Sequence, residues 1–334
     1  MKKANYFQHL LQFKRPGGTS RGILHTKETF ILEITEGNKK GIGECAIFRG
    51  LSSDDVPHYE EQLQWLCDHI NDDEALIKEN LLEFPSLWFG YEQAIRNLKF
   101  GSDIYFENDF TKGNSPIKIN GLIWMGNVDF MREQIEEKLN LNFDCIKLKI
   151  GVNWEEEKTV IAELRQLFPK EKLEIRVDAN GAFSFEKAKN VLQELFDLGI
   201  HSIEQPIKAG QIDFMAELCA STPTPIALDE ELIGKNRLSE KIEILQKIKP
   251  QYIILKPSLV GGFSGSDEWI SEAQKLGIDW WITSALESNI GLNAIAQYTY
   301  SKNSKLPQGL GTGGLFTNNF DANLVLKEDQ LWHL

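Results

Sequence analysis

The first part of the chain shows the alternation of apolar and polar positions that is typical of β-strands, followed by helical periodicity. The alternation predicts three strands, over residues 6–13, 29–34 and 41–45. Glu36-Gly37-Asn38 predicts a hairpin turn between the last two strands. Apolar residues then recur at a helical spacing over 59–70 and 91–98. We therefore expect an α+β module of about 110 residues at the start of the chain.

A different pattern follows the polar, turn-rich stretch 104–116, because short apolar runs now alternate with amphipathic helical segments. The runs cover residues 117–120, 145–150, 173–178, 202–204, 225–229, 252–256 and 280–284. Strands that alternate with helices form parallel sheets. Seven strands, with an eighth possible at 308–311, suit a closed TIM-like barrel better than an open sheet. The predicted fold class is therefore α/β.

The same patterns predict where the domains meet. We place the N-terminal α+β domain at 1–112 and the barrel at 113–316. The remaining segment, 317–334, contains a further apolar run at 324–326 and is expected to return to the N-terminal domain.

Composition and charge indicate which kinds of molecule the protein can bind. The 334 residues carry a formal net charge of −13, and Lys and Arg occur singly or in pairs. Without a basic stripe we expect no nucleic-acid or membrane partner. There is no run of 18 apolar residues and no secretory signal pattern, and the four cysteines are far apart without a CxxC pair. We expect a cytoplasmic protein that acts on a small molecule, as a monomer or a homo-oligomer.

The candidate chemistry lies at the ends of successive predicted strands. Each of six strands ends at or near one polar residue, at Lys149, Asp178, Glu204, Asp229, Lys256 and Ser284. The intervals of 25 to 29 residues each match one strand-helix unit. All six side chains should therefore lie at the C-terminal face of the barrel, where barrel enzymes place their active sites.

Asp178, Glu204 and Asp229 are carboxylates on three consecutive strands, and together they require a cation. Hard oxygen ligands of this number favour Mg²⁺, with Mn²⁺ as a possible substitute. Lys149 and Lys256 flank the three, and a divalent cation nearby would lower the pKa of a lysine toward that of a general base. A lysine with Mg²⁺ can remove a proton from the carbon next to a carboxylate, because the metal stabilises the enediolate.

Each residue also has a simpler interpretation. A single acidic residue at a strand end is most often a helix N-cap or a surface partner, and Lys147 and Lys149 could form ion pairs on an outward strand face. The recurrence at one repeat period favours a site. The sequence has no GxGxxG after a strand, no GxSxG and no HExxH, so the signatures of dinucleotide binding, serine hydrolysis and zinc proteolysis are missing.

The strand ends together resemble the enolase superfamily, in its muconate-lactonizing-enzyme-like branch. The matching segments are KLKI with Lys147 and Lys149, RVDANG with Asp178 and Asn180, IEQP with Glu204, LDE with Asp229 and ILKP with Lys256. The resemblance covers essentially the whole chain. It implies a modified (β/α)7β barrel with an N-terminal α+β capping domain to which the C-terminus returns.

Within this branch the chain is most similar to the o-succinylbenzoate synthase family, through SALESNIG at 284–291 and GLGTGGLF at 309–316. That resemblance implies a lyase of menaquinone biosynthesis, which converts 2-succinyl-6-hydroxy-2,4-cyclohexadiene-1-carboxylate to 2-succinylbenzoate by syn loss of water. Lys149 would remove the proton and protonate the leaving hydroxyl, Lys256 would stabilise the intermediate by its charge, Lys147 would tune the base, and Asp178, Glu204 and Asp229 would hold Mg²⁺.

By the same resemblance, loops 19–22 and 48–52 would close over the barrel mouth. The expected substrate-binding residues are Arg21, Arg49, Asn180, Ser284, Glu287, Gly311 and Thr312. Of these, Arg49 is the candidate for the succinyl carboxylate.

Three alternatives stay open. Dipeptide epimerases, N-acylamino acid racemases and cycloisomerases of the branch share the two lysines and the three carboxylates, but neither 284–288 nor 309–313 offers the DxD pair of a dipeptide epimerase. This difference favours a substrate without an α-ammonium group. Lys256 could instead form a Schiff base, which would leave the carboxylates idle. A barrel kept only as a binding scaffold predicts the loss of a ligand residue, and none is lost.

Overall fold

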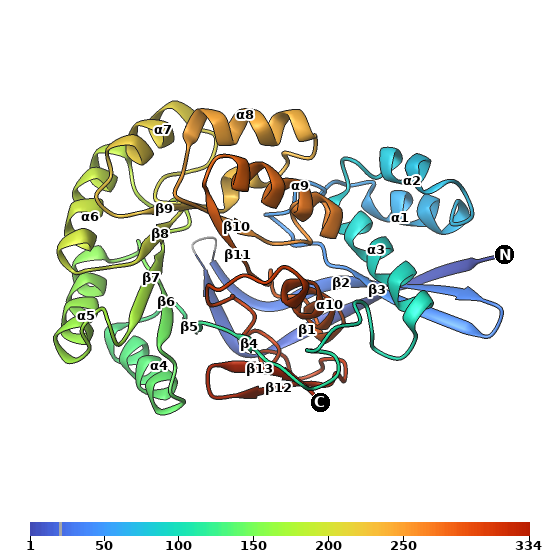
Figure 1. The fold of residues 1–334 in the computed structure, drawn as a ribbon, viewed down its shortest axis with the longest axis horizontal. Helices are drawn as coiled ribbons and strands as arrows, with labels where there is room; N and C mark the ends of the chain where they lie inside the picture. The colour runs from blue at the N-terminus through green and yellow to red at the C-terminus, as the bar shows by residue number, and fades with distance from the viewer. Residues whose placement is uncertain (20–21) are drawn as a thin grey trace.

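The computed structural model describes residues 1–19 and 22–334, and Figure 1 shows an α+β lobe beside a barrel. The lobe begins with the antiparallel sheet β1 (Lys3–Thr19), β2 (Gly22–Glu36) and β3 (Lys39–Cys45). Three helices follow, α1 (Tyr59–Asp68), α2 (Glu74–Asn80) and α3 (Pro85–Phe100). The three predicted strands, the hairpin turn and the two predicted helices are confirmed, whereas α2 was not predicted.

Glycines allow α3 to lie directly on the sheet. A Cβ at Gly43 would lie 1.9 Å from the carbonyl oxygen of Gly90, and one at Gly41 would lie 2.1 Å from that of Ala94. Only glycine permits such an approach between strand and helix backbones. The lobe has its own apolar core, in which Phe30 of β2 packs near Tyr59 of α1.

Seven parallel strands form the barrel sheet. They are β5 (Gly121–Ile123), β6 (Cys145–Lys149), β7 (Glu174–Asp178), β8 (Ser202–Glu204), β9 (Ile226–Leu228), β10 (Tyr252–Leu255) and β11 (Asp279–Ile282), hydrogen-bonded in this order. The helices between and after them are α4 (Val128–Asn140), α5 (Trp154–Leu167), α6 (Phe185–Asp197), α7 (Ile212–Ser221), α8 (Leu238–Ile248), α9 (Gly262–Lys275) and α10 (Asn289–Ser301). The predicted alternation of strand and helix is confirmed.

The ring is closed by an eighth extended segment at the predicted place. Gln308 bridges Ile119, and Gly309 bridges Thr283, both in parallel orientation. The amide of Asn120 donates to Gln308 O at 2.9 Å, and that of Gly309 donates to the carbonyl of β11 Ile282 at 2.8 Å. The fold is therefore a (β/α)7β barrel with a preceding α+β lobe.

The prediction of the first barrel strand at 117–120 is only half right, because Ile119 and Asn120 pair with the eighth segment of the barrel whereas Ile117 and Lys118 pair with the C-terminal segment. The strand that pairs with β6 is β5, just after this run. Instead, β4 (Ile117–Lys118) pairs antiparallel with β13 (Gln330–His333), which pairs with β12 (Leu324–Lys327). The first half of the apolar run therefore pairs with the C-terminal hairpin, and its second half pairs with the eighth barrel segment.

The C-terminal segment also contacts the first lobe. The amide of Thr317 donates to Gln12 O of β1 at 2.9 Å, and the rings of Phe13 and Phe316 lie 4.7 Å apart. At the far end of the segment, His333 Nε2 lies 3.1 Å from the carboxylate of Asp103. The domain boundaries at 112 and 317 stay a prediction.

The lobe is joined to the barrel by apolar and polar contacts. Leu11, Ala46, Phe48 and Phe89 belong to the apolar core that fills and surrounds the barrel. The β3 carboxylate Glu44 accepts hydrogen bonds from the amides of Ser288 and Gly291 at the start of α10, both at 2.9 Å. These contacts hold the end of the first sheet against the barrel face at which the strand ends lie.

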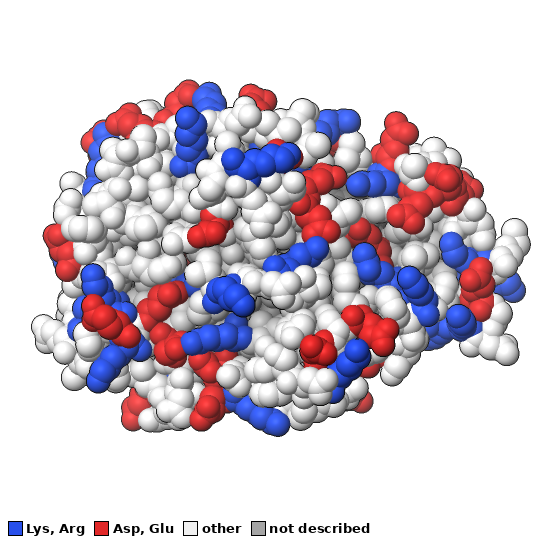
Figure 2. Space-filling model, in the orientation of Figure 1, with Lys and Arg blue, Asp and Glu red and all other residues white. Residues whose placement is uncertain are grey.

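The surface and the thiols add little further chemistry. Acidic and basic side chains are interspersed over the face shown in Figure 2. In the part of the chain that the structure describes, no helix has both the length and the apolar character needed to span a bilayer. All four cysteines are buried and free.

Candidate active site

The strand register brings the polar strand ends together. Lys149 of β6 is level with Asp178 of β7, which is level with Glu204 of β8. Asp229 follows β9 directly, and Lys256 follows β10. The three carboxylates are only 1% to 2% exposed. Because parallel strands end at one edge, five charged groups from five consecutive strands meet at one face of the barrel.

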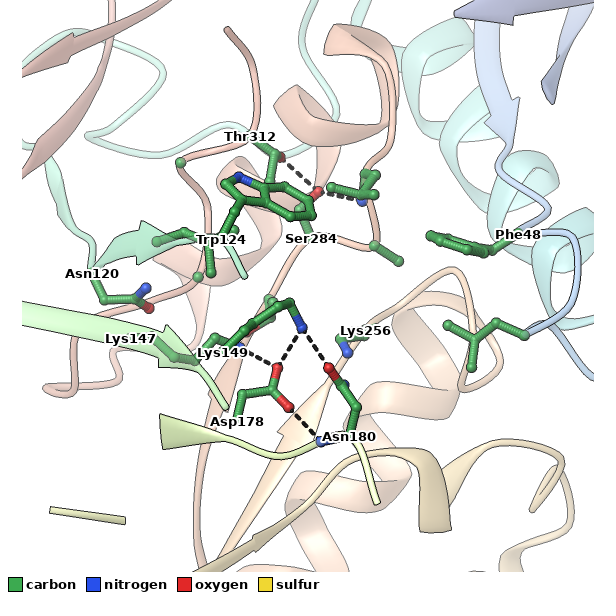
Figure 3. Close-up of a pocket in the computed structure, with 17 residues that line it drawn as sticks. Phe48, Asn120, Trp124, Lys147, Lys149, Asp178, Asn180, Lys256, Ser284 and Thr312 are labelled. Carbon is green, nitrogen blue, oxygen red and sulfur yellow. Dashed lines mark hydrogen bonds and ion pairs between the residues drawn. The ribbon is translucent and has the colours of Figure 1, made fainter. Parts of the chain in front are cut away.

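A cavity opens over this cluster and is walled by both lobes (Figure 3). Its polar side contains Lys147, Lys149, Asp178, Asn180 and Lys256. Its apolar side is formed by Phe48, Leu51, Leu122, Trp124, Ala285 and Leu286, with Asn120, Thr283, Ser284, Gly309, Gly311 and Thr312 completing the wall. The cavity thus combines charged groups with an apolar surface, as small-molecule sites do.

Each carboxylate of the cluster is engaged by a lysine. Lys147 Nζ donates to Glu204 Oε2 at 2.7 Å and lies 3.5 Å from Asp178 Oδ2. Lys149 Nζ donates to Asp178 Oδ2 and to Asn180 Oδ1, both at 2.8 Å (Figure 3). Lys256 Nζ contacts Asp229 and lies 3.8 Å from Glu204 Oε1. In this arrangement the ammonium groups balance the negative charge that the strands bring together.

The pKa values record the cost of this concentration of charge. Burial and the charge of Asp178 raise the pKa of Glu204 to about 8, although Lys147 opposes the rise. Burial also raises the pKa of Asp229, against the charge of Lys256. At Asp178 burial acts in the same direction, but the charges of Lys149, Lys147 and Lys256 outweigh it and lower the pKa. Glu204 is therefore the carboxyl group for which the charged form is most costly.

Two opposing effects act on the pKa of Lys147 and Lys256: burial lowers it, and the neighbouring carboxylates raise it. At Lys147 the charges of Glu204 and Asp178 outweigh burial and raise the pKa. At Lys256 the charges of Asp229 and Glu204 do the same. Both lysines therefore carry a proton while the carboxylates are their partners.

The donor set fits a hard divalent cation. Three buried carboxylates on adjacent strands supply oxygen ligands of the kind that Mg²⁺ prefers. Glu204 Oε1 is buried without a hydrogen-bond partner, although Lys256 Nζ lies 3.8 Å away. As the side chains stand, no group of three or more His, Cys, Asp and Glu in the described ranges is arranged to hold a metal. Binding a metal here therefore requires some of these side chains to rearrange.

Asn180 and Gln205 shape the loops around the cluster. Asn180 has φ of +44°, a left-handed conformation that Asn tolerates, and its Nδ2 donates to Glu230 Oε1 at 3.0 Å. Gln205 also has a positive φ, of +41°, and its Oε1 accepts from the amides of Asp229 at 3.2 Å and Glu231 at 3.3 Å. Sequence analysis missed Gln205, although it follows Glu204 in the IEQP segment. Its role is to hold the loop that begins at Asp229.

Ser284, Thr312 and Glu287 form an internally bonded wall. Ser284 Oγ donates to Glu287 Oε2 at 2.6 Å and accepts from Thr312 Oγ1 at 2.8 Å. Glu287 is fully buried behind Ser284 and also accepts from Ser258 Oγ and from the amide of Ala285. These bonds hold Leu286 at φ of +65°, with its side chain in the cavity wall. Glu287, expected to bind substrate, therefore lies behind the wall and supports it.

Some residues of the predicted lid loops line the cavity and others do not. Phe48 and Leu51 line the cavity. Arg49 is not brought there, because its guanidinium group pairs with Glu28 and with Asp55 on the partly exposed side of the loop. Arg21 and the centre of loop 19–22 lie outside the described residues. Asn120, Trp124 and Thr283 line the cavity although sequence analysis did not select them.

Comparison with known proteins places this geometry in a family. The sequence family described as Enolase C-terminal domain-like matches residues 130–322. An o-succinylbenzoate synthase from Desulfotalea psychrophila is 43% identical, over 96% of this chain and 96% of that protein. An L-Ala-D/L-Glu epimerase from Bacillus subtilis is 26% identical, over 60% of this chain and 51% of its own length.

A solved structure agrees with the sequence comparison. The crystal structure of MenC from Desulfotalea psychrophila superimposes with a TM-score of 0.88 at 39% identity and covers 99% of both chains. The likeness therefore includes the first lobe, the barrel and the C-terminal hairpin together. With the barrel, the lysines and the three carboxylates in place, the chain belongs to the enolase superfamily of enzymes.

Proposed function

We propose that the protein is an o-succinylbenzoate synthase, a lyase that removes water from 2-succinyl-6-hydroxy-2,4-cyclohexadiene-1-carboxylate to give 2-succinylbenzoate in menaquinone biosynthesis. The observation that carries the chemistry is the position of Lys149 and Lys256, which reach one cavity from β6 and β10 across three carboxylates. The choice of substrate is supported by the relative at 43% identity, which carries this name.

Asp178, Glu204 and Asp229 would hold the divalent metal, which in this superfamily is paired with a lysine or histidine base and is generally Mg²⁺. When bound, the metal supplies positive charge to the carboxylate of the substrate and so favours the enediolate. The buried, unpartnered Glu204 Oε1 is an oxygen that such a cation would satisfy. Mn²⁺ prefers the same ligands and is a possible substitute.

The lysines carry the proton transfers. Neutral Lys149 Nζ removes the proton from ring carbon 1, next to the carboxylate, and the resulting ammonium group returns a proton to the hydroxyl that leaves carbon 6. One base suffices because both groups leave from the same face. Asn180 accepts from Lys149 Nζ at 2.8 Å and thereby positions it. Lys256 faces the ring from the other side and stabilises its negative charge, and Lys147 holds Glu204.

The apolar wall serves the ring. Phe48, Leu122, Trp124 and Leu286 surround the cavity opposite the charged cluster, which suits a six-membered carbocycle better than a charged peptide. Their contact with the ring excludes water from Lys149 and its partners, and electrostatic interactions strengthen when water is excluded.

An ultraviolet progress curve tests this proposal. Purified protein with Mg²⁺ should convert the cyclohexadiene carboxylate to the aromatic product, and EDTA should abolish the reaction until excess Mg²⁺ is restored. Absence of turnover by protein that binds Mg²⁺ would contradict the proposed substrate. Turnover that persists in EDTA would contradict the role of the carboxylates, and trapping by borohydride would point to a Schiff base at Lys256.

Epimerisation of dipeptides or racemisation of N-acylamino acids is the second candidate. The observation that favours it is the same pair of facing lysines, because a racemase needs an acid and a base on opposite faces of one carbon. Proton exchange with deuterated water at the α-carbon of such compounds, at a rate equal to or above the dehydration, would favour this alternative.

A further inference from the structure

Lys27 of β2 is a buried lysine outside the catalytic cluster. It is 6% exposed and is paired across the sheet with Leu11, which is completely buried. Thr29, two residues along the strand, shares its face and is also buried. This face of the sheet packs toward the barrel, because Leu11 and Phe48 belong to the barrel core. The side chain of Lys27 therefore lies in the layer between the two lobes.

The ammonium group of Lys27 has no hydrogen-bond or ion-pair partner among the described residues. Its Nζ is buried and makes no hydrogen bond, and no ion pair within 4 Å involves it. The other two buried lysines differ, because Lys147 Nζ pairs with Glu204 and Lys241 Nζ pairs with Glu268 at 2.8 Å. Burial lowers the pKa of Lys27, although nearby Glu44 and Glu287 oppose the effect. A buried cation without a hydrogen-bond or ion-pair partner is costly and rare.

The two nearest buried carboxylates are already committed to other donors. Glu44 accepts from Thr29 Oγ1 at 2.8 Å, from the amide and hydroxyl of Ser288 and from the amide of Gly291. Glu287 accepts from Ser258 and Ser284, both at 2.6 Å. The negative charges of Glu44 and Glu287 stabilise the ammonium form of Lys27 in the interior. Neither carboxylate accepts a hydrogen bond from the three N–H donors of Lys27.

Lys27 lies next to the apolar side of the cavity. Its Nζ is 6.0 Å from the centre of the Phe48 ring, and Phe48 lines the cavity. Glu287, which acts on its pKa, directly follows Leu286 in the opposite wall. A shift of the Phe48 ring is therefore the movement that would open the ammonium group to a bound molecule.

The proposed substrate needs a second cation. It carries two carboxylates, of which one belongs with the metal and Lys149. The Ser284 hydroxyl already donates its hydrogen bond to Glu287 and accepts one from Thr312. Arg49 is paired with Glu28 and Asp55 away from the cavity. Lys147, Lys149 and Lys256 are all directed at the metal-binding carboxylates. Lys27 is the uncommitted cation beside the cavity in the described part of the chain.

We propose that Lys27 binds the succinyl carboxylate of the substrate and thereby selects a dicarboxylate, with the Phe48 ring moving aside to admit it. This inference rests on the proposed function. It assigns to Lys27 the role that the sequence suggested for Arg49.

A comparison of two substrates in two variants tests the inference. The substrates are the dicarboxylate and its methyl ester at the succinyl end, which removes one negative charge. Lys27→Met should lower kcat/KM for the dicarboxylate by about 100-fold, mainly through KM, and change kcat/KM for the ester by less than about 3-fold. Lys27→Arg keeps the charge and should retain kcat/KM for the dicarboxylate within about 10-fold of wild type.

Thermal unfolding separates this role from a structural one. If Lys27 held the lobes together, Lys27→Met would unfold at a lower temperature and lose activity on both substrates alike. If it is kept for the substrate, replacing an unpartnered buried charge by an isosteric apolar side chain leaves Tm unchanged or raises it. Lys40→Met is the matched control, because it removes an exposed lysine of β3 that is paired with Glu33 of β2. It should change neither Tm nor the activity on either substrate.

These experiments distinguish failure of the Lys27 assignment from failure of the proposed function. Equal losses on both substrates, or no loss on either, would overturn the assignment of Lys27. Failure of the wild-type protein to convert the dicarboxylate would contradict the proposed function instead. In that case calorimetric binding of 2-succinylbenzoate and of its succinyl methyl ester decides the assignment, because only the binding of the diacid should weaken in Lys27→Met.

Discussion

Replacing Glu204 with glutamine tests whether the charged form of this buried carboxyl group lowers the stability of the metal-free protein. Burial, and then the charge of Asp178, raise the pKa of Glu204 from 4.5 to about 8. Between these values the folded protein binds a proton at Glu204 that the unfolded chain does not bind, so the free energy of unfolding falls as the pH rises through this window. At about 1.4 kcal/mol per pKa unit, the shift corresponds to about 5 kcal/mol.

Relaxation around the charged cluster reduces this value. We expect Glu204→Gln to raise the free energy of unfolding relative to the wild type, and this difference should grow by about 2 to 5 kcal/mol from about pH 5 to about pH 9. The assay is urea unfolding of both proteins in EDTA across this range. All other titrating groups are shared, so the difference between the two free energies reports Glu204 together with the neighbouring groups whose pKa values depend on its charge. Glu133→Gln, an exposed change on α4, should follow the wild type. A difference that is constant with pH would refute the reasoning.

Three further predictions concern metal binding, the proposed base and the packing of α3 on the first sheet. Mg²⁺ at about 100 times its Kd should stabilise the wild-type protein by about 2.7 kcal/mol and leave Glu204→Gln unchanged, as measured by thermal unfolding. Lys149→Ala should keep the wild-type circular dichroism spectrum and lower kcat by at least about 1,000-fold, and retained turnover would exclude it as the base. Gly43→Ala should cost about 3 kcal/mol in urea unfolding, because its Cβ would lie 1.9 Å from Gly90 O, whereas Gly314→Ala, where a Cβ meets nothing within 4 Å, should cost far less.

The barrel could be predicted because its strands and helices repeat. A strand with its helix takes nearly constant length, so a polar residue at each strand end is enough to predict that Lys149, Asp178 and Glu204 share one face. The errors lie where this repeat does not apply. Helix α2 has only 7 residues, which is too short for a clear period. Ile117–Lys118 has the pattern of a barrel strand, but its partner β13 follows more than 200 residues later.

The substrate-binding side was harder to predict because it depends on contacts between distant segments. Arg49 is an attractive cation in the sequence, and only the fold shows that Glu28 and Asp55 already bind it. Lys27 is the reverse case. A lysine in an alternating strand is expected to face solvent, and nothing near Lys27 in the sequence indicates that β2 turns this side toward the barrel.

The same contrast explains which residues each lobe can supply. The barrel strands end at fixed positions, so Lys149, the proposed base, and Lys256, proposed to stabilise the intermediate, are both held in the cavity wall by the sheet. Among the described residues of the first lobe, Phe48 and Leu51 line the cavity and Lys27 lies beside Phe48, so a change there leaves the strand ends intact. If Lys27 binds the substrate as proposed, selection of the substrate can change in the first lobe without loss of the chemistry. Lys27→Met tests this separation directly, because it should alter the choice between diacid and ester while proton removal from the ester continues.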